Sequence, residues 1–179
     1  MERSREFKVK VCLLGDGAVG KTSLIRKFVY NEFDDKYIMT LGAKTSKKVV
    51  SLPNPKDRSP VDISLMISDV MGQTDVRSIH DAYLFGTKGA IIVCDFTRRS
   101  TLENIKNWME RLRKVCGEVP VALVVNKYDL IFDAQFDFKA LQSLAEGYGC
   151  PAFVSSAKTG ENVEKVFHSL AERLMLLRL

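Results

Sequence analysis

The stretch "GDGAVGKTS", Gly15 to Ser23, decides the fold class of this 179-residue chain. It follows an alternating apolar run, "FKVKVCLLG", and precedes "SLIRKFV", in which apolar residues recur at helical spacing. The stretch matches the pattern Gly-x-x-x-x-Gly-Lys-Ser/Thr at Gly15, Gly20, Lys21 and Thr22. A loop of this pattern between a strand and a helix predicts a phosphate-binding site.

The chemistry of the pattern explains its residue types. Glycines let consecutive backbone N–H groups point at phosphate oxygens, and the helix that starts there adds the positive end of its dipole. We expect Lys21 to place its charge on the terminal phosphates and Thr22 to offer its hydroxyl to Mg²⁺, which prefers hard oxygen ligands. This motif leaves open whether the nucleotide is ATP or GTP, and whether the protein is a kinase, a motor or a switch.

Composition sets wider limits on the class of protein. Hydrophobic residues make up 46% and charged residues 27%, ordinary proportions for a soluble globular protein, and the length fits one domain over residues 1–179. Apolar runs are too short for a membrane span, and "MERSREFKVK" is too charged for a signal peptide. We therefore expect a cytoplasmic protein.

Charge and cysteine usage exclude two further classes. The net charge is +5, but basic residues are interleaved with acidic ones, as in "NIKNWMERLRKVCGE", which indicates a solvated helix face and no nucleic-acid partner. The cluster "KTSKK", residues 44–48, stays open as a surface-binding segment. Four cysteines without a Cys-x-x-Cys pair favour buried thiols over a metal or redox site.

Strand-length apolar runs alternate with helical patterns along the chain. The strand-like runs after the first are "VDISLMIS", "GAIIVCDFT", "VPVALVVN" and "PAFVSS". The helical patterns cover 102–115, with a capping box of Ser100 and Glu103 and a stop at Gly117, then 141–148 and 163–174. This order predicts an α/β fold: a mostly parallel, six-stranded, doubly wound sheet with helices on both faces.

One segment departs from the alternation. The run "AKTSKKVVSLP" leads through "NPKDRS" into the next strand with no helix between. Short strands joined by a proline-rich turn predict one antiparallel hairpin at the edge of the sheet.

A second motif selects the base. The residues Asn126, Lys127 and Asp129 of "VVNKYD" follow an apolar strand, where open parallel sheets bind ligands. An ionised Asp129 only accepts hydrogen bonds, and guanine offers adjacent N–H donors, whereas adenine would present a lone pair. A site built for a group that adenine lacks discriminates by about 10⁴ or more. The segment "SSAK", Ser156 to Lys158, follows the last strand and could close the base pocket.

A third motif concerns hydrolysis. Asp69, Gly72 and Gln73 of "SDVMGQ" follow the strand over residues 61–67. We expect Asp69 to hold Mg²⁺ through a water, the Gly72 amide to sense a γ-phosphate, and Gln73 to orient the attacking water. Gln73 is thus the candidate catalytic residue.

Together these segments resemble the five nucleotide-binding boxes of the Ras superfamily of small GTPases. They are Gly15 to Thr22, Thr40 in "YIMTLG", Asp69 to Gln73, Asn126 to Asp129, and Ser156 to Lys158. The resemblance spans about Phe7 to Leu174. Within the superfamily, "GAIIVCDFTRRSTLENIKNW" and "SSAKTGENVEKVF" are similar to the Rab branch, and "YIMTLG" is also similar to GTPases of the septation and mitotic-exit network.

The resemblance implies a role for each matched position. Phosphates would be wrapped by Asp16, Gly17, Ala18, Val19, Gly20, Lys21, Thr22 and Ser23. Phe33 would pack edge-on against guanine, and Tyr37 would cover the phosphates. The Mg²⁺ ligands would be Thr22, Asp69 and, in the GTP state, Thr40.

On the base side, the resemblance implies that Asn126 touches both the base and the phosphate loop. Lys127 would lay its stem along the base, and Ala157 would donate its N–H to the guanine carbonyl. Ser156 and Lys158 belong to the same expected pocket.

The function implied is a GTP-driven switch with loops at about 33–45 and 69–83. Hydrolysis should be slow alone, because "NEFDDKYIMT" offers no arginine in cis. Expected partners are effectors, exchange factors and GTPase-activating proteins. No cysteine follows Cys150 and the chain begins "ME", so we expect no lipid anchor, membrane contact only through partners, and a monomer.

Two rival interpretations remain. Met71 stands where many relatives of the resembled family have alanine or glycine, which motivates a guanine-nucleotide-locked interaction module with little hydrolysis. A P-loop kinase or ATPase is the more distant rival, because it gives no reason for "NKYD".

Overall fold

The computed structural model describes residues 5–36, 43–70, 77–133 and 136–178. The strands are β1 (Arg5–Leu14), β2 (Ala43–Pro53), β3 (Pro60–Val70), β4 (Gly89–Asp95), β5 (Val121–Asn126) and β6 (Ala152–Val154). The helices are α1 (Lys21–Tyr30), α2 (Arg77–Leu84), α3 (Arg99–Glu103), α4 (Ile105–Cys116), the 3₁₀ segment η1 (Tyr128–Asp133), α5 (Phe138–Tyr148) and α6 (Val163–Leu176).

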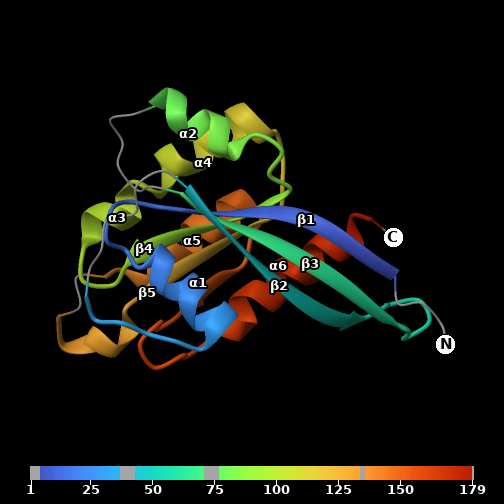
Figure 1. Cartoon of the computed structure of the whole chain (residues 1–179). Coiled ribbons are helices and arrows are strands. Elements are labelled where there is room, and N and C mark those ends of the chain that lie inside the picture. The colour runs from blue at the N-terminus through green and yellow to red at the C-terminus, as the bar shows by residue number, and fades with distance from the viewer. Residues whose placement is uncertain (1–4, 37–42, 71–76, 134–135, 179) are drawn as a thin grey trace.

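The described strands form one six-stranded sheet in the order β2-β3-β1-β4-β5-β6. All neighbouring pairs are parallel except β2 and β3, which are antiparallel, with β2 at the edge. The predicted α/β class, strand number and edge hairpin are confirmed. Because β1, β3, β4, β5 and β6 run the same way, the loops that follow them lie at one end of the sheet (Figure 1).

In the edge hairpin, β2 coincides with the quoted run "AKTSKKVVSLP", and β3, also of 11 residues, extends beyond the quoted run "VDISLMIS". Pro53 ends β2 and Pro60 begins β3, at positions where a missing N–H costs the ladder little. Between them, the buried Asn54 donates its N–H to the Ser59 carbonyl at 2.8 Å and accepts the Arg58 N–H at 2.9 Å. The turn is therefore closed by its own backbone.

The capping box predicted at Ser100 and Glu103 is wrong, and the helix predicted over 102–115 is divided into α3 and α4. Ser100 lies inside α3, and Arg98 at the N-cap makes no side-chain capping bond. The helix is interrupted at Asn104, where ψ is −6° before α4 begins. Asn104 turns its side-chain amide to Asp16, far away in the sequence, and hydrophobic spacing carries no signal of such a contact. The predicted stop at Gly117 is confirmed, with φ at +71°.

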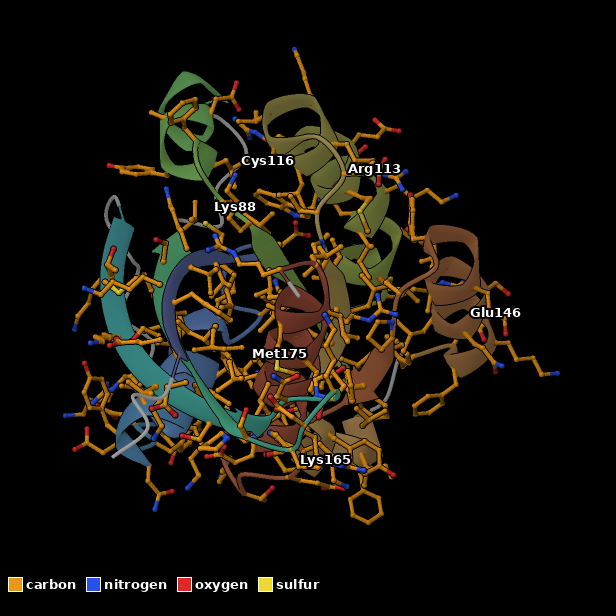
Figure 2. All side chains as sticks on the ribbon, turned by 90° about the vertical axis from the view of Figure 1, so that its right-hand side faces the viewer. Lys88, Arg113, Cys116, Glu146, Lys165 and Met175 are labelled. Carbon is orange, nitrogen blue, oxygen red and sulfur yellow. The ribbon has the colours of Figure 1, made fainter. Side chains whose placement is uncertain are left out.

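Helices cover both faces of the sheet, as predicted. Figure 1 shows α1 and α6 on one side and α2 and α4 on the other, and each side has its own buried cluster. Figure 2 shows Met175 of α6 turned into the interior, where it is 4% exposed, whereas Glu146 and Lys165 stand at the outside. The two apolar layers hold the sheet rigid under the loops at its end.

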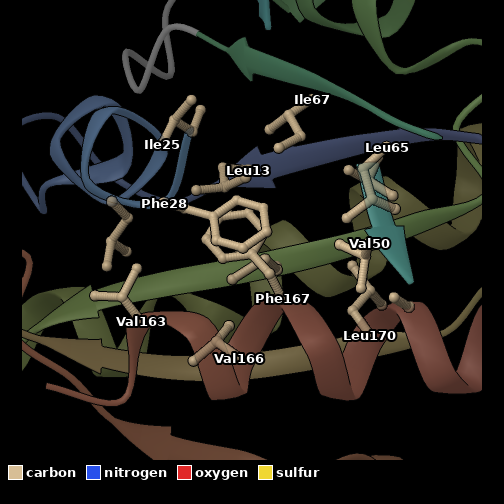
Figure 3. Packing of buried hydrophobic residues seen from close by; sticks show 14 of the residues in the cluster. Leu13, Ile25, Phe28, Val50, Leu65, Ile67, Val163, Val166, Phe167 and Leu170 are labelled. Carbon is tan, nitrogen blue, oxygen red and sulfur yellow. The ribbon is translucent and has the colours of Figure 1, made fainter. Parts of the chain in front are cut away.

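An aromatic stack joins the two helices of the first face. The rings of Phe28 in α1 and Phe167 in α6 lie 4.0 Å apart at an interplanar angle of 2° (Figure 3). Both side chains are at most 2% exposed. The loop over Gly15 to Ser23, for which phosphate binding was predicted, is the phosphate loop. Since α1 begins in this loop, the aromatic contact anchors its helix on the sheet.

Replacing Phe167 with alanine should lower the free energy of unfolding by about 3–5 kcal/mol, because a buried ring is removed and leaves a cavity. Urea denaturation measures this. Phe132→Ala is the matched control, since Phe132 is 99% exposed and its loss should change stability by less than about 0.5 kcal/mol. Equal losses in the two variants would refute the assignment of the stack to the core.

Candidate functional site

The loop between β1 and α1 has the curled backbone that a phosphate cradle needs. Gly15 and Gly20 have φ of +138° and +98°. Both also lack space for a side chain: a Cβ on Gly15 would lie 2.2 Å from the Val93 carbonyl oxygen, and one on Gly20 would lie 2.2 Å from Asn126 Nδ2. Ala18 shares the left-handed conformation at +61°, which its residue type did not reveal.

Lys21 begins α1 and turns its side chain back over the loop. Its Nζ donates to the carbonyls of Gly15 and Asp16, both at 2.8 Å, and the residue is 7% exposed. Burial lowers the pKa of the Lys21 amine to about 8, although the carboxylates of Asp69 and Asp16 act in the opposite direction. A largely desolvated cation over this loop is suited to a polyanion.

The carboxylate expected to serve Mg²⁺ lies beside the hydroxyl expected to do the same. In the parallel ladder Asp69 is level with Leu13, just before the phosphate loop. Asp69 Oδ2 accepts a short hydrogen bond from Thr22 Oγ1. Two hard oxygen donors at this spacing fit a Mg²⁺ ion that keeps several waters. Within the described ranges, no group of three histidine, cysteine or acidic side chains gathers as a metal site.

Asn126 joins three loops. The end of β4 places Asp95 level with Asn126 at the end of β5. The Asn126 side chain is buried, donates Nδ2–H to the Val19 carbonyl at 3.0 Å, and accepts the Ala157 N–H on Oδ1 at 3.0 Å. The phosphate loop and the segment after β6 are thereby fixed to the loop after β5.

A hydrogen bond joins Asp129 and Ser156, two residues that the sequence analysis assigned to the base pocket. Ser156 is buried and donates its Oγ–H to Asp129 Oδ1 at 2.6 Å, across 27 residues. Asp129 itself is half-buried. The carboxylate is thus oriented by a hydroxyl, and among the described residues its other acceptor sites are open to two N–H donors.

Lys127 is held by a residue that the sequence analysis did not select. Its Nζ lies 2.7 Å from Oδ2 of the buried Asp95, and its backbone has φ of +69°. Burial alone would raise the pKa of Asp95, but the hydrogen bonds from Lys127 and Thr97 outweigh it and hold the pKa below its ordinary value of 3.8. Asp95 is therefore a stable anion beside the loop after β5 that carries Lys127 and Asp129, the base-side loop.

Three other residues predicted for the nucleotide site are only partly buried or exposed. Phe33 is 37% exposed, and Lys158 forms an ion pair with Asp35 at 3.7 Å, which links the segment after β6 to the start of the first expected switch loop. Ser23 is half-buried in the first turn of α1. The remaining predicted residues lie outside the described ranges: Tyr37, Thr40, Met71, Gly72 and Gln73.

The structure adds residues that sequence reasoning missed. Asp16 was predicted only as part of the phosphate wrap, yet its side-chain Oδ1 accepts hydrogen bonds from Trp108 Nε1, at 2.8 Å, and from Asn104 Nδ2. Arg98 donates to the Gly17 carbonyl at 2.7 Å. None of these carries a sequence signal, because each partner lies about 80 to 90 residues away along the chain.

The described part of the chain contains no helix of the length and apolar character that crossing a membrane requires.

Comparison with known proteins agrees with the geometry. The model of the Ras family matches residues 10–176. The chain is 34% identical to the Ras-related protein Rab-21 of Homo sapiens over 172 residues, which cover 96% of this chain and 74% of that protein. It is 36% identical to the Ras-related protein Rab-1D of Dictyostelium discoideum over 172 residues, with 96% and 81% covered. Identity to the Ras-related protein Rab-27B of Homo sapiens is 31% over 176 residues, with 95% and 81% covered.

Proposed function

The chain belongs to the Ras family of small GTPases, and on this premise we propose that it cycles between a GTP-bound and a GDP-bound state. Members of this family act as molecular switches, bind GTP or GDP with Mg²⁺, and interact with effectors, exchange factors and GTPase-activating proteins. For this chain we propose one G domain over residues 1–179 and two switch loops, at about 33–45 and 69–83. The monomeric state and the cytoplasmic location stay predictions from the sequence.

One observation carries the proposal: Asn126 bonds at once to the phosphate loop at Val19 and to the base-side segment at Ala157. A nucleotide has a base at one end and phosphates at the other, so its site needs two loops at a fixed separation. Asp129, oriented by Ser156, supports guanine as the base, because a carboxylate accepts from two adjacent N–H groups.

The described residues also support the position of the switch loops. Ala43, near the end of the first proposed loop, pairs with Val70, near the start of the second, in the β2–β3 ladder. The second loop is fixed where α2 ends, since Lys10 Nζ donates to the carbonyls of Tyr83 at 2.6 Å and Phe85 at 2.8 Å. Changes at the γ-phosphate end would thus act on two loops that meet at one ladder, where the first ends and the second begins.

In the proposed mechanism, Lys21 and the amides from Asp16 to Ser23 bind the phosphates, and Asp129 with the Ala157 segment orients the base. Thr22 and Asp69, joined by Thr40 in the GTP state, would hold Mg²⁺, which neutralises phosphate charge when bound. Gln73 would orient the attacking water. Hydrolysis should be slow alone, and an arginine supplied by a partner could accelerate it about 10³ to 10⁵-fold.

The test begins with the nucleotide that the purified protein retains, identified after denaturation by ion-exchange chromatography. We expect GDP or GTP, displaceable by either but not by a large excess of ATP. Retained adenine nucleotide, or displacement by ATP, would exclude the proposal.

Hydrolysis is tested by Gln73→Leu. Turnover of bound GTP should fall about tenfold, as expected for one lost orienting hydrogen bond in the transition state. Gln142→Leu is the matched control, because Gln142 is exposed in α5 and bonds only Glu146 among the described contacts. Retention of intact GTP for hours at 37 °C by the wild type with Mg²⁺ would instead favour the locked interaction module.

A further inference from the structure

The outer side of the phosphate loop is held by a guanidinium. Arg98 Nη2 donates to the Gly17 carbonyl at 2.7 Å, and Arg98 Nε lies 3.0 Å from Asp95 Oδ2. The same Asp95 oxygen lies 2.7 Å from Lys127 Nζ. One carboxylate, 1% exposed, thus connects the base-side loop to an arginine that bonds the phosphate loop.

The backbone around Arg98 is fixed, so its side chain starts from a defined position. The Arg98 N–H donates to the Asp95 carbonyl at 3.0 Å, and Thr101 Oγ1 donates to the Arg98 carbonyl at 2.7 Å. The planar guanidinium then reaches two acceptors with separate N–H groups, a geometry that a lysine amine cannot reproduce.

The bond to Gly17 also orients the next amide. In a trans peptide, the carbonyl of one residue and the N–H of the next point in opposite directions, and no described peptide is cis. A Gly17 carbonyl turned toward Arg98 therefore turns the Ala18 N–H away from it. Ala18 has φ of +61°, so the peptide that precedes it needs an outside partner to hold an uncommon conformation.

We propose that Arg98 is a positioning residue of the phosphate loop, which fixes the peptide between Gly17 and Ala18 and ties it through Asp95 to Lys127. This inference rests on the proposed function, since it concerns the loop assigned to the phosphates. Arg98 acts on the loop backbone and is distinct from an arginine that neutralises charge on the reacting phosphate.

The main experiment measures release of a fluorescent GDP analogue from Arg98→Ala. We expect release to be about tenfold faster than in the wild type, the size of one charge-assisted hydrogen bond. Arg99→Ala is the matched control: the neighbouring arginine is 65% exposed and pairs with Glu103 on the surface, so its release rate should stay within about twofold of the wild type. Equal rates in Arg98→Ala and Arg99→Ala would overturn the proposal.

Arg98→Lys separates geometry from charge. A lysine keeps the charge but can bond one partner at a time, so we expect a release rate between those of the wild type and Arg98→Ala. Full restoration by lysine would refute the two-partner role. The link through Asp95 is tested in an Asp95→Asn background, where the effect of Arg98→Ala should shrink to less than threefold; an undiminished effect would refute that link.

A second readout does not require nucleotide affinity. Amide hydrogen exchange of the protein as purified, followed by NMR, should be about tenfold faster at residues 17–20 in Arg98→Ala and unchanged in Arg99→Ala. If the wild type retains no guanine nucleotide, the proposed function fails, whereas the exchange data still decide the role of Arg98. Unchanged exchange in Arg98→Ala would refute that role whatever the nucleotide.

Discussion

Replacing Asp129 with alanine should weaken GDP binding by about 10²-fold to 10³-fold, because removing one partner of a desolvated charged contact costs about 2–5 kcal/mol. The sharper expectation concerns inosine diphosphate, whose base lacks the exocyclic amine of guanine. The wild type should prefer GDP to inosine diphosphate by about tenfold, the worth of one hydrogen bond to a charged acceptor. In Asp129→Ala the two ligands should bind equally.

The ratio of the two dissociation constants isolates the contact, because any general damage to the fold weakens both ligands alike. Isothermal titration calorimetry with both diphosphates measures it. Asp137→Ala is the matched control, because Asp137 is exposed and caps α5 through the N–H groups of Lys139 and Ala140. If Asp129→Ala still prefers GDP to inosine diphosphate, the Asp129 carboxylate does not recognise the base.

Replacing Lys21 with methionine should weaken GDP binding by a similar factor, about 10²-fold to 10³-fold, through loss of the buried cation that faces the phosphates. The fold itself should tolerate this change. Burial already lowers the pKa of the Lys21 amine to about 8, so the cost of desolvating its charge offsets its hydrogen bonds to the Gly15 and Asp16 carbonyls, and methionine has a similar volume.

The two effects are separated by measuring GDP affinity and the melting temperature of the nucleotide-free protein. In Lys21→Met the affinity for GDP should fall by this factor, while the melting temperature stays within a few degrees of the wild type. Lys27→Met, on the same helix and half-buried, is the matched control and should bind GDP normally. Comparable loss of affinity in both variants would mean that helix α1, rather than the Lys21 charge, is what the nucleotide requires.

Much of the fold was predictable because its signals are local. The hydrophobic alternation of β3 places Val61, Ile63, Leu65 and Ile67 in the core, and each is at most 1% exposed. The edge hairpin followed from a proline-rich turn with no helix around it, although β3 extends beyond the predicted run. The α3–α4 boundary was missed because the interruption at Asn104 accompanies a contact with Asp16, in a different loop.

The candidate site likewise contains residues that local motifs predicted and residues that only long-range contacts identify. Lys21, Asn126 and Asp129 stand in short motifs, and the structure brings Asp129 to Ser156 and Asn126 to Val19. Asp95 and Arg98 lie in a stretch, "DFTRRS", whose composition matches an ordinary charged loop. Their importance depends on distances of 2.7 Å from Asp95 to Lys127 Nζ and 2.7 Å from Arg98 to the Gly17 carbonyl, which no spacing along the chain encodes.

The sequence by itself determined the strand, loop and helix around Gly15 to Ser23, the α/β class and the residue types that would meet a guanine nucleotide. These properties depend on neighbouring residues, whose backbone conformation and side-chain period are set within a few positions. Only the tertiary structure decided that Arg98 and Asn126 donate to the phosphate-loop carbonyls of Gly17 and Val19. The register of β4 and β5 places those side chains, and register is a property of the assembled sheet.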